Sequence, residues 1–270
     1  MSEVEKIKNN DPASIAEKHD KAASPSEVPA QITRLRLPPS NTKLILARIL
    51  KFFSTPEGCD NALMLIQYFG NVVVWLLNKR GQKKTAGRVG KLSSMISDYR
   101  IMARLLDFFP LYLSSIDSLK NPPKDKLLSA VSILQDISMM LYYPLERIYW
   151  FGAHNIIPVS DMTVLKAGIY SCRFWAVWVV LNFIKLDSAR KALLLQKKRI
   201  MSKQDSDAES MQKELGQVDS QLKAWKYSFG NTLAYLPLTV HWSLEKSNFP
   251  DVLVGVCGTI AGVCAAVNRW

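Results

Sequence analysis

The sequence predicts an all-α fold: a membrane-associated helical bundle with an amphipathic helix and a C-terminal glycine-rich hydrophobic helix. No stretch alternates between apolar and polar residues at a period of two, which a half-buried strand requires. Charged residues make up 21% of the chain, below the quarter that is usual for soluble domains, while aromatic residues reach 10%. Residues 252–267 carry no charge at all. Together these observations favour helices in contact with a membrane.

The net charge of +12 is unevenly distributed along the chain. Residues 1–30 hold four Lys against six acidic residues, whereas residues 34–110 hold thirteen Lys and Arg against four acidic residues, a net charge of +9. A segment this basic favours a negatively charged partner such as anionic lipid, nucleic acid or an acidic protein.

Residues 1–40 are expected to be a disordered tail, because they combine polar residues with five prolines and few large apolar side chains. They lack the apolar segment of a secretory signal peptide. The first helix is expected over residues 43–53. Residues 54–57, Ser-Thr-Pro-Glu, form a helix-start signal with Thr as the N-cap and Pro in the first turn. A second helix should follow over about residues 57–78.

Residues 83–109 are expected to form a single amphipathic helix. Its apolar arc consists of Val89, Leu92, Met95, Ile96, Tyr99, Ala103 and Leu106. Its cations are Arg88, near the start of the arc, and Lys91, Arg100 and Arg104 along the edges. Such a helix suits an anionic membrane interface. A bundle helix that buries the same arc is the alternative.

The second half of the chain predicts further long helices. One is expected over residues 124–150, with a kink at Pro144. Another covers residues 164–184, which are apolar and aromatic with Arg173 near the centre. Residues 185–223 are expected to be a charged helical connector with a break near Ser206. Residues 225–244 then return to aromatic and apolar character.

The C-terminal segment predicts close helix packing. Small residues recur on one face of the expected helix at Gly255, Gly258, Gly262 and Ala266. Such a face lets a second helix approach closely, in the same chain or in a homo-oligomer. With about 16 uncharged residues, the segment is a short span, a re-entrant segment or a buried core helix.

No motif for catalysis, metal binding or a cofactor is found. The histidines stand alone, the four cysteines form no CxxC pair, and no phosphate-binding glycine loop is present. The basic segment lacks a nucleic-acid-binding module, and its cations are interleaved with an apolar face. We therefore expect a protein that is not an enzyme, has no cofactor, and binds an anionic phospholipid membrane and no nucleic acid.

Several motifs, in this order, resemble the peroxin-11 family of peroxisomal membrane proteins. They are the stretch 48–60, Gln67-Tyr68, the basic helix start at Gly87-Arg88, Glu146-Arg-Ile-Tyr-Trp150, and the ending with Gly255, Gly258, Ile260, Gly262 and Trp270. The resemblance covers about residues 42–270 and defines a peroxin-11-like helical membrane domain over residues 41–270. Cys59 departs from the family, which usually has Arg there, so a divergent fungal-type branch is expected.

The resemblance implies a protein of the peroxisomal membrane that elongates the organelle before fission and promotes its proliferation. It also implies an amphipathic helix that inserts into one leaflet, homo-oligomerisation, and partners among fission adaptors and a dynamin-related GTPase. Two other classes remain open: a membrane channel for small metabolites and a soluble helical scaffold.

Overall fold

The computed structural model describes residues 41–202 and 208–270. The chain divides into two compact units, residues 1–48 and 49–270. The expectations for the tail, residues 1–40, and for a break near Ser206 lie outside the described residues. The described part of the chain is helical throughout and contains no strand, which confirms the all-α prediction.

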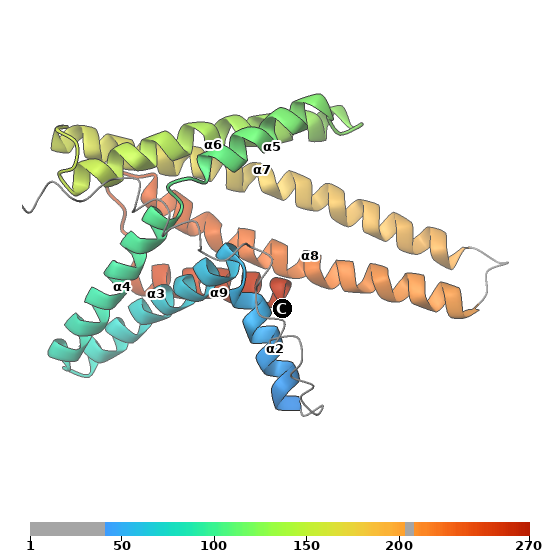
Figure 1. Ribbon diagram of the computed structural model, residues 1–270, viewed down its shortest axis with the longest axis horizontal. Coiled ribbons are helices and arrows are strands. Elements are labelled where there is room, and N and C mark those ends of the chain that lie inside the picture. The colour runs from blue at the N-terminus through green and yellow to red at the C-terminus, as the bar shows by residue number, and fades with distance from the viewer. Residues whose placement is uncertain (1–40, 203–207) are drawn as a thin grey trace, which may run out of the picture. The chain divides into compact units, whose positions relative to one another are not determined.

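The first described helix is α2 (Asn41–Phe53), drawn in blue in Figure 1, and its residues up to Arg48 are assigned to the first unit. The second unit holds the other seven described helices. These are α3 (Pro56–Lys79), α4 (Lys83–Ala103), α5 (Phe108–Lys120), α6 (Lys126–Ala153), α7 (Asp161–Met201), α8 (Ala208–Trp242) and α9 (Asp251–Arg269).

Helix α3 begins at the helix-start signal predicted over residues 54–57. The Thr55 hydroxyl accepts a hydrogen bond of 3.1 Å from the Gly58 amide, and Pro56 occupies the first turn. One amide that lacks a partner within the helix is thereby satisfied.

The seven helices of the second unit pack as a series. In order of contact they are α4, α3, α9, α8, α7, α6 and α5, each packed on the next. A small core lies where α3, α8 and α9 meet, with Met64, Leu238 and Ala261 at its centre. Many large apolar side chains elsewhere remain exposed.

Three described helices are long and apolar enough to cross a membrane: α3, α7 and α9. In their most apolar windows, between 22% and 28% of the residues are buried within the chain. Most of this apolar surface is therefore left for an apolar surrounding, which agrees with a membrane-associated bundle.

Within the expected charged connector, residues 185–201 form the end of α7 and residues 208–223 form the beginning of α8. These two segments pack on each other, with Ile200 and Val218 almost completely buried. The Trp225 indole donates to the Leu186 carbonyl at 2.7 Å, and Lys197 pairs with Asp219 at 2.6 Å.

The prediction of one helix over residues 83–109 is wrong. Helix α4 ends at Ala103, residues 104–107 form a bend, and α5 begins at Phe108. Pro110 contributes to the break, because a helix continuing through it would lose the hydrogen bond to Leu106 and clash with that carbonyl. In the first turn of a new helix, the same proline is tolerated.

Candidate membrane-remodelling site

Helix α4 packs on α3 through a face of small and polar residues. Ala86, Ser93 and Arg100 are buried there, seven residues apart, and therefore lie on one side of the helix. Opposite Ser93 is Gly70, where an added Cβ would lie 2.4 Å from the Ser93 hydroxyl oxygen. The small residues allow close contact and turn the other side of α4 outward.

The outward side of α4 carries most of the predicted apolar arc. Leu92, Met95 and Tyr99 are 53%, 61% and 60% exposed. Ala103 is also exposed, whereas Val89 and Ile96 are half-buried at the edge of the contact with α3. None of the described helices covers this face, so the bundle does not bury the arc as the alternative interpretation required.

Of the four predicted lipid-binding cations, Arg88 and Lys91 are exposed on α4. The assignment of Arg100 is wrong, because its side chain is buried and points to α3. Its guanidinium donates to both carboxylate oxygens of Asp60 at 2.8 and 3.1 Å and to the Gln67 amide oxygen at 2.8 Å. This two-pronged pair holds the buried guanidinium against α3 and away from the outer side of α4.

Arg104 follows the last residue of α4 and points to α6. It donates to the Arg100 carbonyl at 3.1 Å and lies 3.5 Å from the Glu146 carboxylate. Arg104 is therefore half-buried against α6 and directed to the polar side of α4, so its assignment to the lipid-facing edge is wrong as well.

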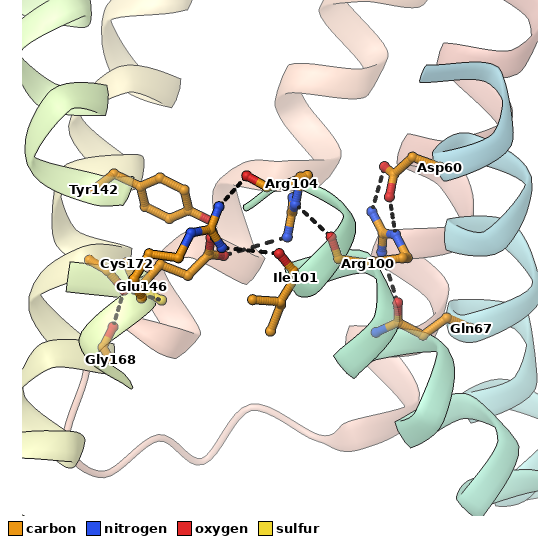
Figure 2. A network of polar contacts seen from close by, with 11 residues as sticks. Asp60, Gln67, Arg100, Ile101, Arg104, Tyr142, Glu146, Gly168 and Cys172 are labelled. Atoms are coloured by element: carbon orange, nitrogen blue, oxygen red, sulfur yellow. Dashed lines mark hydrogen bonds and ion pairs between the residues drawn. The ribbon is translucent and has the colours of Figure 1, made fainter. Parts of the chain in front are cut away.

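These side chains belong to a polar cluster between α3, α4 and α6. Its members are Asp60, Gln67, Arg100, Arg104, Tyr142, Glu146 and Arg147. Figure 2 shows the end of α4 between the two neighbouring helices, with Asp60 and Gln67 on one side and Glu146 and Tyr142 on the other. The cluster joins α4, at one end of the packing series, to α6.

Glu146 is the central acceptor on the α6 side. The Tyr142 hydroxyl donates to it at 2.5 Å, and Arg147 pairs with it at 3.2 Å. Burial holds the pKa of Tyr142 well above its usual range, so the phenol stays neutral and remains a donor.

Arg147 gives a second reason why α4 ends at Ala103. Its guanidinium donates to the carbonyl oxygens of Ile101, at 3.0 Å, and Arg104. In a continuous helix these carbonyls would accept from the amides four residues later. The amides of Leu105, Asp107 and Phe109 instead donate to residues three before them, so the chain bends but keeps a helical path.

The exposed apolar residues continue through this bend into α5. We call this set the outer stripe: Leu92, Met95, Tyr99, Met102, Leu106, Phe109 and Leu113. Their spacing alternates between three and four residues, and each is at least 45% exposed. The sequence prediction stopped at Leu106, although the same spacing continues across Pro110 and could have revealed the α5 members.

The glycine face of α9 packs on α3 of the same chain. An added Cβ at Gly258 would lie 2.2 Å from the Tyr68 ring, and one at Gly262 would lie 2.7 Å from Leu65. Gly255 faces the α3 backbone, where an added Cβ would lie 3.0 Å from the Tyr68 carbonyl oxygen. Ala266, one turn further on, is half-buried.

Comparison with known families shows which proteins the chain is related to. Residues 46–270 match the model of the family described as peroxisomal biogenesis factor 11. The chain belongs to this family. The peroxin-11 resemblance drawn from the motifs is confirmed.

Individual proteins are also similar to the chain. Human peroxisomal membrane protein 11C is 26% identical over 217 residues, covering 77% of this chain and 87% of the relative. Mouse peroxisomal membrane protein 11C is 24% identical, with 75% and 84% covered. An uncharacterised fission yeast protein is 23% identical, with 77% and 85% covered. No solved structure matches the chain.

The chain is therefore a peroxisomal membrane protein with a role in peroxisome biogenesis and proliferation. The peroxisomal biogenesis factor 11 family is a family of biogenesis membrane proteins and not of enzymes.

Proposed function

We propose that this protein elongates the peroxisomal membrane without catalysis, by inserting the outer stripe into one leaflet. Apolar side chains at headgroup depth expand the leaflet that they enter, and this favours curvature. The observation that supports the proposal is the exposure of the stripe in a folded chain whose opposite α4 face is already occupied.

The cations that remain exposed on α4 suit an anionic surface. Arg88 lies on the same side of α4 as the outer stripe, and Lys91 lies beside the stripe. Both are near the N-terminal end of the helix. Each cation near such a surface contributes about 1 kcal/mol of binding, so two would strengthen membrane binding roughly 30-fold. Arg100 takes no part in this attraction, because its guanidinium is buried against α3.

The polar cluster instead holds the stripe in position. Asp60 and Gln67 fix Arg100 from α3, while Arg147 binds the last carbonyls of α4 from α6. The outer stripe can act as a wedge that bends a membrane only if it keeps a constant depth and tilt relative to the part of the protein that is anchored in the membrane. Helices that cross the membrane, α3 among them, would provide that anchor.

Homo-oligomerisation would gather wedges and amplify bending. Because α3 occupies the glycine face of α9, we propose that copies meet through another surface. The outward face of α9 is a candidate, with Val256, Ile260 and Val263 exposed. Fission adaptors and a dynamin-related GTPase would then act on the elongated membrane.

The test is tubulation of liposomes by the full-length protein carrying Leu92→Glu and Tyr99→Glu. Both residues are exposed, so the fold should survive while the apolar stripe acquires two negative charges. We expect tubulation of anionic vesicles to fall at least tenfold, as counted by electron microscopy. A dye trapped in the same vesicles should stay inside, which separates a wedge from a channel.

The matched control is Gly87→Glu with Ser94→Glu. It adds the same charge to exposed positions of α4 outside the stripe, and an added Cβ at Gly87 meets no atom within 4 Å. Equal tubulation by both variants would show that the stripe is not the wedge.

A further inference from the structure

The helices of the second unit surround a half-open cavity of about 510 Å³, and part of the polar cluster lines it. Residues of α3, α4, α6, α7 and α8 line it, together with the loop that precedes α9. Its lining includes the charged side chains of Arg100 and Arg104 and the aromatic side chains of Trp175, Tyr235 and Trp242. A cavity of this size with a few charged groups among aromatic walls is typical of a ligand site.

The charges of the polar cluster do not balance. Three arginines face two carboxylates, and each carboxylate has a close arginine of its own. Asp60 binds Arg100 at 2.8 Å, and Glu146 binds Arg147 at 3.2 Å. Arg104 is the surplus cation, since its contact with Glu146 measures 3.5 Å.

Arg104 also differs from the other two arginines in exposure. Its side chain is 32% exposed and lines the cavity, against 9% for Arg100 and 13% for Arg147. Glu245, the further acidic residue lining the cavity, is exposed at the loop and solvated. Arg104 shares the Glu146 carboxylate with the closer Arg147, and a half-buried cation that shares its carboxylate favours a further anion beside it.

We infer that the cavity binds a phosphate group through Arg104. A guanidinium matches phosphate oxygens with parallel hydrogen bonds, and hydroxyl groups of Ser97 and Tyr149 also line the cavity. The volume is much larger than a single small ion requires, and the aromatic wall offers an apolar surface for the rest of the molecule. The phosphate is carried by a membrane lipid or by a soluble metabolite.

This inference is independent of membrane remodelling and is tested by binding alone. The full-length protein is placed in phosphatidylcholine nanodiscs, and its unfolding temperature is followed by tryptophan fluorescence. Inorganic phosphate is titrated against chloride of equal ionic strength in one arm. In the other arm, nanodiscs contain increasing phosphatidic acid.

Two variants each remove one arginine charge: Arg104→Gln in the cavity and Arg199→Gln near the exposed end of α7, which lines neither the cavity nor the outer stripe. We expect one phosphate source to raise the unfolding temperature of the wild type and of Arg199→Gln. The dissociation constant of Arg104→Gln should be at least tenfold larger. Protection by inorganic phosphate identifies a soluble ligand, and protection by phosphatidic acid alone identifies a lipid headgroup.

Without ligand, Arg104→Gln should be at least as stable as the wild type, since a surplus cation has been removed. If that variant does not fold, Arg104→Lys keeps the charge but loses the paired donors, and should bind more weakly than Arg199→Gln. The inference is overturned if neither source protects the wild type, or if the Arg104 and Arg199 variants are protected equally.

Discussion

Arg100 illustrates how a single contact decides what a charged residue can do. On the sequence it lies at the edge of an apolar arc, where a cation suits lipid. In the fold it is 8% exposed and bonded to Asp60 and Gln67 on α3. A buried charge depends on its partner, because the cost of losing water is offset only by that partner.

Asp60→Asn should therefore destabilise the protein by about 2–3 kcal/mol, because Arg100 would keep its charge without a carboxylate. This is the low end for a buried pair, since the Asp60 side chain is 31% exposed. Denaturation of the protein in detergent micelles measures the change. The double variant Asp60→Asn/Arg100→Gln should recover most of the loss.

The matched control is Asp187→Asn, whose partner Lys191 is in an exposed pair. Its effect should stay within about 0.5 kcal/mol. If the two single variants cost the same, the Asp60–Arg100 pair would not be a buried anchor of α4.

At the scale of elements, the contact between α3 and α9 depends on missing side chains. The Tyr68 ring fills the space above Gly258, and Leu65 fills the space above Gly262. Aromatic rings are rigid, so an added methyl group must push the helices apart.

Gly258→Ala should cost about 1–3 kcal/mol, although alanine is the better helix former. The control Gly87→Ala lies in the exposed part of α4 with nothing within 4 Å of the added Cβ, and it should stabilise the helix by about 0.5–1 kcal/mol. Thermal unfolding of both variants should show a lower unfolding temperature for Gly258→Ala and a higher one for Gly87→Ala. A stable Gly258→Ala protein would argue against the close α3–α9 contact.

The helices could be predicted from the sequence, because caps and apolar spacing are local signals. The Thr55 cap and the C-terminal apolar helix are examples. The end of α4 could not be predicted in this way, because Arg147, more than forty residues away in the chain, binds the last carbonyl groups of α4. The cavity likewise depends on which helices become neighbours, and no local pattern records that.

For the whole molecule, the exposed apolar surface of α3, α7 and α9 distinguishes an integral protein from a soluble scaffold. Water cannot cover that surface at low cost, whereas lipid can. The series of packed helices buries a small core and leaves many large apolar residues outside it.

Alkaline carbonate washing of peroxisomal membranes should therefore leave the full-length protein in the membrane pellet. A peripheral protein of the same membranes, released by the wash, serves as the control. Recovery of this chain in the supernatant would favour the soluble scaffold and would leave the exposed helices in need of a protein partner.

The length of α7 has a consequence for how soluble molecules meet the protein outside the membrane. Its 41 residues extend about 60 Å, roughly twice the hydrocarbon thickness of a bilayer. If the apolar first half crosses the membrane, the charged second half, paired with α8, stands about 25 Å above the surface. A soluble molecule that recognises the paired ends of α7 and α8 could therefore bind the protein without touching the membrane. Binding of that molecule and bending of the membrane would then take place at different distances from the lipid.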